Sequence, residues 1–180
     1  MVAMKAIFLD RDGVINYLVE RMGGQKTAPW TYEEFKLVPG IVSACQDLTD
    51  AEYALFVCTN QPDTECGKGP LTYSELAKMH IMIKNLIEIK EIISCEDRNS
   101  SSYKPNNGMI EYLIDKYKVD RTKSYMIGDT WKDIVAGNKS QLKTILIGND
   151  YEYPYQYKDI KPDFIVNDII DAVKAIEGAK

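Results

Sequence analysis

Two aspartates, Asp10 and Asp12, follow a short apolar run and are separated by one residue. In an extended chain, side chains at positions i and i+2 point to the same side, so these carboxylates repel each other unless a cation lies between them. Two more aspartates, Asp129 and Asp133, follow another apolar run. If the fold brings the four together, their hard oxygen ligands suit Mg²⁺, which keeps several waters and accepts a substrate phosphate. The acidic residues therefore predict a magnesium site.

A second group of residues has the chemistry of a phosphate-binding site. Thr59 offers a hydroxyl, Asn60 an amide and Lys104 a compact positive charge, and all three suit phosphate oxygens. Gly13 lets the backbone turn sharply after the acidic pair and approach a ligand closely. A carboxylate nucleophile, a metal, a cation and hydrogen-bond donors are what phosphoryl transfer through an aspartyl-phosphate requires, because positioning and charge stabilisation dominate that chemistry.

The elements that must position these groups follow from hydrophobic periodicity. Short apolar runs alternate with helical patterns, which is typical of βα units and a parallel sheet. Strands are expected at 6–9, 53–58, 92–93, 125–127 and 144–147, with a short sixth at 164–166. Helices are expected at 41–48, at 131–138 and at 168–176. A capping box formed by Thr72 and Glu75 predicts the start of another helix, whose apolar face carries Leu76, Met79, Ile83 and Leu86. A further helix is expected to begin near Pro105 and to run through Tyr117.

Each candidate group then lies at the C-terminal end of a parallel strand, where open α/β sheets bind ligands. Two connections, 14–39 and 61–71, exceed the ~2–6 residues usual for βα loops, and long loops at strand ends are where function concentrates. The segment Tyr151–Tyr157 has tyrosine at every second position. We interpret it as a surface loop or an edge segment packed on one side, with a substrate or partner surface as the alternative.

These residues, in their order along the chain, resemble the four motifs of the haloacid dehalogenase (HAD) superfamily of phosphatases, subfamily III. The motifs read Asp10-x-Asp12-Gly, Thr59-Asn60, Lys104-Pro and Gly-Asp129-x-x-x-Asp133. The stretches 8–16, 59–61 and 125–150 are more closely similar to the branch of histidinol-phosphate and D-glycero-D-manno-heptose-1,7-bisphosphate phosphatases. The resemblance implies an α/β, Rossmann-like three-layer sandwich with a central, mainly parallel sheet of five or six strands and a minimal cap, as one domain over residues 1–180.

The resemblance also implies a role for each motif residue. Asp10 would attack phosphorus and bind Mg²⁺, and Asp12 would protonate the leaving oxygen, later activate water, and bind the metal through its backbone carbonyl. Asp129 would be a side-chain metal ligand. Asp133 would bind the metal through a water molecule or would contact the residues that bind it. Thr59, Asn60 and Lys104 would hold the phosphoryl oxygens. Arg11 belongs to the branch pattern and is assigned no role.

One departure from the branch concerns a zinc loop. Many relatives carry C-x-H followed by C-x-C-R-K-P, whereas this chain has Cys95-Glu96-Asp97 and then Ser-Ser-Ser-Tyr103-Lys104-Pro. A tetrahedral Cys/His site cannot be built from one surviving cysteine, so no zinc is expected. Tyr103 stands where relatives place a substrate-contacting arginine, a departure that concerns substrate identity and leaves the superfamily chemistry intact. The resemblance implies phosphomonoester hydrolysis, with a small sugar phosphate such as heptose bisphosphate as the leading substrate.

Composition limits the partners. The formal net charge of −5 provides no global attraction to nucleic acid or to an anionic membrane, and no apolar stretch approaches the ~20 residues that a bilayer requires. The four cysteines form no C-x-x-C pair, and the N-terminus lacks a signal-peptide pattern, which favours a reduced, cytoplasmic protein. The expected partner is a small phosphorylated metabolite, and the sequence does not indicate an oligomeric state.

Two other functions use the same residues. A receiver-like domain also gathers acidic residues, a threonine and a lysine around Mg²⁺, but it places its phosphoacceptor after a middle strand, whereas Asp10 follows the first strand. A receiver keeps its phosphate, and a phosphatase turns over. The second alternative is a binding module that keeps the HAD fold without activity.

Overall fold

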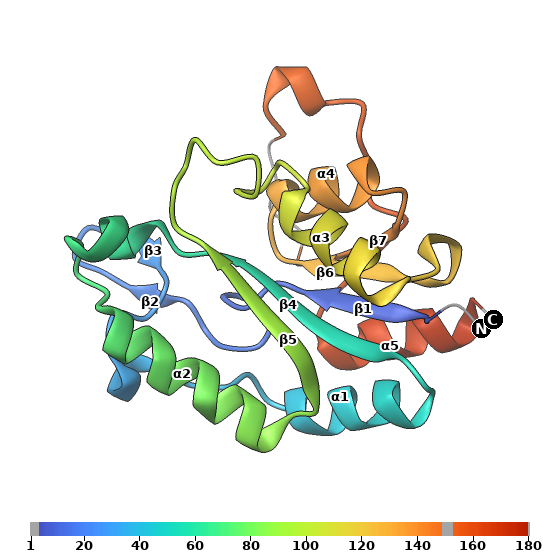
Figure 1. The fold of residues 1–180 in the computed structure, drawn as a ribbon, viewed down its shortest axis with the longest axis horizontal. Helices are drawn as coiled ribbons and strands as arrows, with labels where there is room; N and C mark the ends of the chain where they lie inside the picture. The colour runs from blue at the N-terminus through green and yellow to red at the C-terminus, as the bar shows by residue number, and fades with distance from the viewer. Residues whose placement is uncertain (1–3, 149–152, 180) are drawn as a thin grey trace.

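The computed structural model describes residues 4–148 and 153–179 and contains a central sheet between two layers of helices. The six strands are all parallel, in the order β5-β4-β1-β6-β7-β8 (Figure 1). Their bounds are β1 Ala6–Leu9, β4 Ala54–Asn60, β5 Ile89–Cys95, β6 Tyr125–Gly128, β7 Lys143–Ile147 and β8 Phe164–Val166. The helices are α1 Ile41–Asp50, α2 Tyr73–Leu86, α3 Gly108–Tyr117, α4 Trp131–Lys139 and α5 Ile169–Gly178. The predicted α/β sandwich is confirmed.

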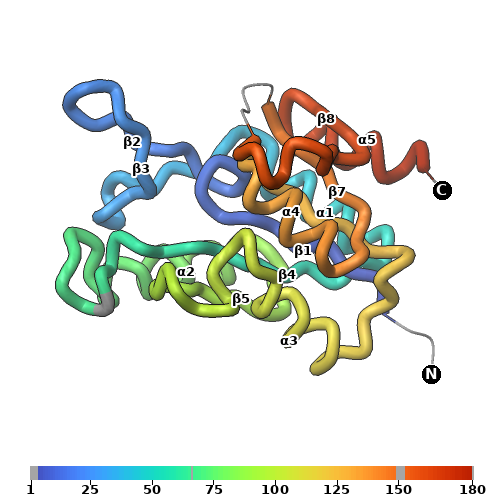
Figure 2. Tube along the Cα trace, turned by 90° about the horizontal axis from the view of Figure 1, so that it is seen from above, coloured from blue at the N-terminus to red at the C-terminus, as the bar shows by residue number. Residues whose placement is uncertain are grey.

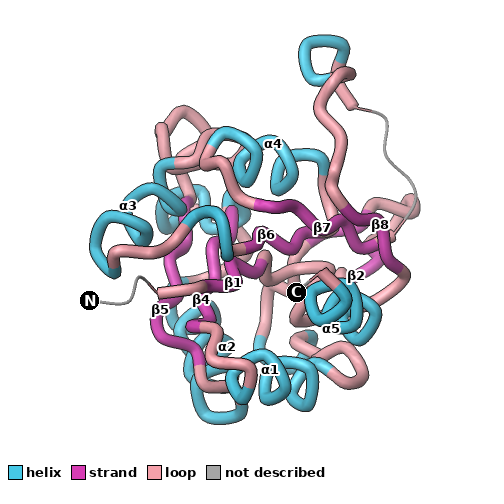
Figure 3. The backbone as a smooth tube through the Cα atoms, turned by 90° about the vertical axis from the view of Figure 1, so that its right-hand side faces the viewer, coloured by secondary structure: helices cyan, strands magenta, loops and turns pink. Residues whose placement is uncertain are grey.

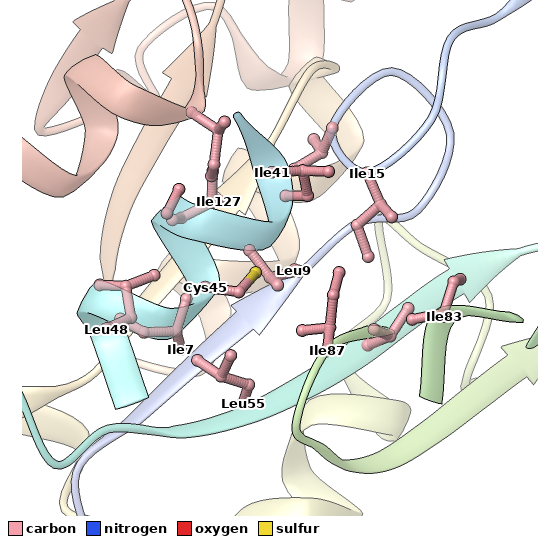
Figure 4. Packing of buried hydrophobic residues seen from close by; sticks show 14 of the residues in the cluster. Ile7, Leu9, Ile15, Ile41, Cys45, Leu48, Leu55, Ile83, Ile87 and Ile127 are labelled. Atoms are coloured by element: carbon pink, nitrogen blue, oxygen red, sulfur yellow. The ribbon is translucent and has the colours of Figure 1, made fainter. Parts of the chain in front are cut away.

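Strand β1 lies inside the sheet and is buried along its whole length because its two faces feed two separate cores. Ile7 and Leu9 pack with residues of α1, α2 and α5 on one side, while Ala6 and Phe8 pack with residues of α3 and α4 on the other. Figure 3 shows the two helix layers on opposite sides of the strands. Figure 4 shows the first cluster, in which Ile41, Cys45 and Leu48 of α1 lie over β1 and β4.

The long connection after β1 contains a small antiparallel hairpin that the sequence analysis did not predict. Its strands, β2 Val19–Glu20 and β3 Lys26–Thr27, have two residues each. Strands this short carry no periodic pattern, so they could not be detected from sequence. The hairpin stands clear of the sheet in Figure 2.

Three sequence expectations for individual elements are wrong. Strand β5 spans seven residues, whereas only two were predicted. The prediction was too short because Glu91 interrupts the apolar pattern of the strand. Leu86, expected on the buried face of α2, is 46% exposed at the end of that helix. Pro105 does not open α3; it follows a cis peptide bond with Lys104 in the connecting turn, and α3 begins at Gly108.

The tyrosine-rich segment is described only from Tyr153 onward, and Tyr151 lies outside the described residues. Tyr155–Tyr157 form a short 3₁₀ turn at the top of Figure 1. Tyr155 is 83% exposed, and the ring of Tyr157 stacks on Trp131 with centroids 5.3 Å apart. This segment therefore packs against the first residue of α4, Trp131. Within the described residues, no helix has the length and apolarity needed to cross a membrane.

Candidate active site

The candidate residues converge at the C-terminal edge of the sheet, around a cavity of ≈ 300 Å³. Asp10 directly follows β1, Thr59 and Asn60 end β4, and Asp129 follows β6. The register of the parallel strands brings these ends side by side, because Leu9 pairs with both Val57 and Ile127. The loop before α3 adds Lys104, and the first turn of α4 adds Asp133.

Three of the four predicted carboxylates form one cluster. Asp10, Asp129 and Asp133 each contribute an oxygen, and these oxygens lie within 4.8 Å of one another. Burial raises the pKa of Asp129 to about 8, and the neighbouring carboxylates of Asp10 and Asp133 add to the shift. Burial likewise raises the pKa of Asp10 to about 7, with Lys104 opposing and Asp133 reinforcing the change. Asp10 and Asp129 therefore resist being charged together in this cluster.

A divalent cation fits this cluster. Oδ1 of Asp129 is buried and accepts no hydrogen bond from any described residue, so a polar atom is left for an additional ligand. The donor set consists of carboxylate oxygens, which suit a hard cation such as Mg²⁺. A bound cation would also offset the repulsion that raises the pKa of both Asp10 and Asp129.

Gly13 is required beside the acidic cluster. Its φ of +91° lies in the region that favours glycine, and a Cβ at this position would lie 1.9 Å from Oδ2 of Asp129. Any larger residue would displace that carboxylate. The sequence expectation of a sharp turn here is confirmed, and the structure adds this close approach.

Lys104 connects the nucleophile candidate to α4. Its buried Nζ lies 2.8 Å from Oδ1 of Asp10 and 2.5 Å from Oδ1 of Asp133. Burial lowers the pKa of Lys104, but the two carboxylates outweigh it and hold the pKa above its ordinary value. Oδ2 of Asp133 accepts from the backbone N–H of Thr130 at 3.0 Å and from its hydroxyl at 2.6 Å. Asp133 therefore caps α4 and also orients the lysine.

The carboxylate of Asp12 does not lie in the acidic cluster, although the sequence analysis expected it beside Asp10. The Arg11 guanidinium donates to Oδ1 of Asp12 from Nε at 3.1 Å and from a terminal nitrogen at 3.0 Å. Asn16 donates to the same oxygen at 3.0 Å, and Gln61 donates to Oδ2 at 2.7 Å. The chain turns after Asp10, so the two side chains do not keep the parallel directions of an extended strand. Asp12 still lines the cavity.

Two predicted phosphate-binding groups have other partners. The side-chain amide of Asn60 donates to the carbonyl of Lys104 and accepts from its N–H, both at 2.9 Å. Asn60 therefore fixes the Lys104 loop against β4, which engages its side-chain oxygen and one of its two amide N–H groups. The hydroxyl of Thr59 accepts from Gln61 Nε2 at 2.8 Å, and its own proton remains available for donation.

Gln61 and Arg11 are site residues whose roles the sequence analysis missed. Gln61 accepts from Arg11 at 3.0 Å while donating to Asp12 and Thr59, so its amide connects three motif residues. Its position directly after Thr59-Asn60 was the available clue. His80, on α2, places Nε2 3.4 Å from Arg11, and burial lowers the pKa of His80 to about 4, with Arg11 adding to the shift. The histidine is a neutral support behind the arginine.

Comparisons with known proteins find relatives in sequence and in fold. A protein-family model described as HAD-hydrolase-like matches residues 103–172. The chain is 29% identical over 170 residues to D-glycero-alpha-D-manno-heptose-1,7-bisphosphate 7-phosphatase of Campylobacter jejuni, covering 87% of this chain and 92% of that protein. It is 33% identical to D-glycero-beta-D-manno-heptose-1,7-bisphosphate 7-phosphatase of Neisseria meningitidis, covering 74% and 71%. The crystal structure of D,D-heptose 1,7-bisphosphate phosphatase from B. bronchiseptica, complexed with magnesium and phosphate, has the same fold, with a TM-score of 0.80 at 22% identity over 98% and 100% of the two chains.

Proposed function

The chain belongs to the HAD-like hydrolase family and is a phosphatase, and from this premise we propose that it removes the 7-phosphate of D-glycero-D-manno-heptose 1,7-bisphosphate with Mg²⁺ as cofactor. The observation that carries the proposal is the position of Asp10. Its carboxylate lies at the end of β1 beside the Lys104 ammonium, within a cluster of three carboxylates that opens into a small cavity. All proposed site residues lie along one edge of one sheet, so we infer that the chain acts as one phosphatase domain.

In the first half-reaction, a carboxylate oxygen of Asp10 attacks phosphorus and the bond from phosphorus to the sugar oxygen breaks. Asp12 gives its proton to the leaving sugar oxygen. The second half-reaction begins when a water molecule attacks the phosphorus of the aspartyl-phosphate. Asp12 accepts a proton from this water, inorganic phosphate leaves, and the Asp10 carboxylate is regenerated.

The other residues of the site stabilise charge and fix positions. Lys104 neutralises negative charge that accumulates on the phosphoryl oxygens and holds Oδ1 of Asp10, while the Thr59 hydroxyl donates to a phosphoryl oxygen. Asn60 acts indirectly, by holding the backbone of Lys104. Asp10, Asp129 and Asp133 would hold Mg²⁺, which supplies positive charge that keeps these carboxylates ionised and balances the charge of the phosphoryl group.

A phosphate-release assay tests the proposal. The purified chain is given the alpha and beta anomers of heptose 1,7-bisphosphate, because the printed names of its relatives differ in the anomer. We expect release of one phosphate per sugar with Mg²⁺ and none with a chelator, and the remaining phosphate should be assigned to carbon 1 by ³¹P NMR.

The outcomes separate the competing functions. Release from carbon 1, or equal release in the chelator, contradicts the proposed reaction. If no phosphomonoester is hydrolysed and Mg²⁺ with inorganic phosphate still binds, the chain is a binding module. The receiver-like alternative predicts a stable phosphoprotein in place of turnover, and the phosphatase relatives do not support it.

A further inference from the structure

Arg11 is a fully buried cation that links the active site to helix α2. Its Nε and Nη2 donate to the carboxylate of Asp12 at 3.0 to 3.2 Å, and Nη2 also donates to Oε1 of Gln61 at 3.0 Å. The remaining terminal nitrogen, Nη1, lies 3.4 Å from Nε2 of His80. Among the described residues, His80 alone forms a hydrogen bond with Nη1. The guanidinium is therefore held from two sides.

The contact with Arg11 fixes the protonation state of His80. A guanidinium carries only donors, so Nε2 of His80 must present its lone pair to Nη1, and the proton of the neutral imidazole lies on Nδ1. The surroundings of the ring favour the same state. Burial lowers the pKa of His80 most, and the positive charges of Arg11 and Lys84 lower it further against an opposing effect of Asp12. His80 is therefore an uncharged acceptor for Arg11.

Helix α2 holds His80 in a defined place. Leu76, Met79 and Ile83 of this helix are buried in the core that also contains one face of β1. His80 follows Met79 directly and is itself half-buried. Side chains on packed helices are positioned more precisely than side chains on loops. The packing of α2 thus determines where the imidazole meets Arg11.

We propose that His80 is a positioning residue for the reaction: it orients the Arg11 guanidinium so that Asp12 stays in reach of the proton that it transfers. This inference rests on the proposed function, because it takes Asp12 as the group that protonates the leaving oxygen and activates water. His80 is not among the described residues that line the cavity, so it acts through Arg11. Without His80, a buried N–H of Arg11 would be unpaired, and the guanidinium would turn away from Asp12 to regain a partner.

Two substitutions separate the hydrogen bond of His80 from its packing. His80→Leu removes the acceptor, whereas His80→Gln keeps one, because the side-chain oxygen of glutamine reaches the place of Nε2. Ile81→Ala is the matched control, since Ile81 lies beside His80 on α2 and is 58% exposed. Each protein is mixed rapidly with p-nitrophenyl phosphate and Mg²⁺. The first turnover reports phosphoryl transfer to Asp10, and the steady state includes the attack of water on the aspartyl-phosphate.

The two steps differ in their need for Asp12. p-Nitrophenolate leaves without a proton, so the first turnover does not require the acid, whereas the attack of water requires the base. His80→Leu should lower the steady-state kcat about 10-fold, the effect of about one hydrogen bond to a charged group, and keep the first-turnover rate within about twofold of wild type. A burst of p-nitrophenol should therefore precede its steady state. His80→Gln and Ile81→Ala should keep both rates within about twofold of wild type.

The imidazole itself gives a spectroscopic readout. His80 is the only histidine of the chain, so ¹⁵N NMR of the ring nitrogens observes it alone. At pH 7 we expect the chemical shifts of a neutral ring with its proton on Nδ1. A proton on Nε2, in either the neutral or the charged ring, would overturn the contact with Arg11.

The kinetic results can also overturn the assignment. They do so if His80→Leu keeps the wild-type kcat, if it slows both steps equally, or if His80→Gln loses as much activity as His80→Leu. Failure of the proposed function gives a different pattern. In that case the wild type does not hydrolyse heptose bisphosphate, while the two rates on p-nitrophenyl phosphate still test His80. A chain that hydrolyses no phosphate ester would contradict both.

Discussion

At the residue scale, the two carboxylates proposed to be catalytic have different hydrogen-bond and ion-pair partners. Asp10 faces a lysine and two other carboxylates, whereas Asp12 accepts hydrogen bonds from Arg11, Asn16 and Gln61. An acid–base group is effective only when its carboxylate is held in reach of the proton that it transfers. We therefore predict that the amide of Gln61 affects turnover through the position of Asp12.

The role of Gln61 is tested by two substitutions. Gln61→Leu removes the donor to Asp12 and the acceptor for Arg11, and Gln61→Glu keeps the acceptor but places a negative charge against Asp12. We expect kcat to fall about 10- to 100-fold in both, a part of the roughly 10²–10⁴-fold effect of positioned acid–base groups, with KM nearly unchanged. Steady-state kinetics on the heptose substrate separate the effect on kcat from the effect on KM.

The control is Gln46→Leu on the exposed surface of α1, which should leave kcat unaltered. Circular dichroism of each variant verifies folding. A rise in KM at constant kcat would mean that Gln61 binds substrate and does not position Asp12.

Asp10 and Asp129 could be predicted to lie together because each directly follows a strand whose position its apolar run reveals. Lys104 and Asp133, which do not directly follow a strand, were predicted from the order and types of the motif residues. Side-chain directions could not be predicted in the same way. Asn60 was expected to bind phosphate, and the structure adds a contact that was not predicted: its side-chain oxygen and one amide N–H pair with the backbone of Lys104, 44 residues further along the chain. Such a partner depends on how loops meet in three dimensions, which a spacing pattern does not contain.

At the element scale, the hairpin is held to the body of the molecule by a few side chains. Arg21, just after β2, donates two hydrogen bonds to Glu34, at 2.6 and 2.7 Å, and its guanidinium lies 3.7 Å from the ring centroid of Trp30. The hydrogen bonds from Arg21 are the largest influence on Glu34 and lower its pKa to about 2. The hairpin that carries Lys26 is therefore anchored partly by an ion pair.

The ion pair predicts a stability difference that depends on pH. An acidic group with a lowered pKa stabilises the fold above its unfolded pKa of about 4.5, and this stabilisation is lost as pH falls towards about 2. Glu34→Gln should thus lower the free energy of unfolding at pH 7 by up to about 1 kcal/mol, as for partly exposed pairs. Urea unfolding at pH 7, 5, 4 and 3 measures the difference in the free energy of unfolding between wild type and Glu34→Gln. A difference that does not become smaller below pH 4.5 would contradict this role of the ion pair.

The fold itself was predictable where elements are long or continuously apolar. Strands β1, β4 and β6 in the middle of the sheet are uninterrupted apolar runs, and α1 has a clear periodic face. Edge strand β5 has a solvated side and was underestimated for that reason. The start of α3 was misplaced because proline is compatible with a turn as well as with the first turn of a helix.

At the scale of the whole molecule, burial of the acidic cluster lowers stability, and we expect a bound cation to restore it. Burial raises the pKa of Asp10 to about 7 and that of Asp129 to about 8, so both groups favour unfolding above their ordinary pKa values. This destabilisation grows as pH rises from about 4 and levels off above about 8. A ligand that binds only the folded chain reverses it by mass action.

Magnesium should therefore raise the free energy of unfolding, by about 2.7 kcal/mol at a concentration of 100 Kd. Asp129→Asn should lose this response. In the presence of a chelator, the free energy of unfolding of Asp129→Asn should be higher than that of wild type at pH 8, because the asparagine amide has no charge to bury. This difference between the two proteins should shrink towards pH 4. Denaturant unfolding with and without Mg²⁺ measures both effects.

Asp115→Asn, on the exposed surface of α3, is the control for charge removal and should respond to Mg²⁺ like the wild type. A wild-type protein whose unfolding is insensitive to Mg²⁺ would contradict cation binding at the cluster. Equal responses in wild type and Asp129→Asn would place the cation elsewhere.

The central claim is that Asp10 carries the phosphoryl group during turnover. Borohydride added during hydrolysis reduces an aspartyl-phosphate, so peptide mass spectrometry should find homoserine at position 10 only when substrate is present. In parallel, Asp10→Asn should lower kcat by at least about 1,000-fold, while Asp115→Asn keeps it. Undiminished turnover by Asp10→Asn, together with reduction at no residue, would contradict the account.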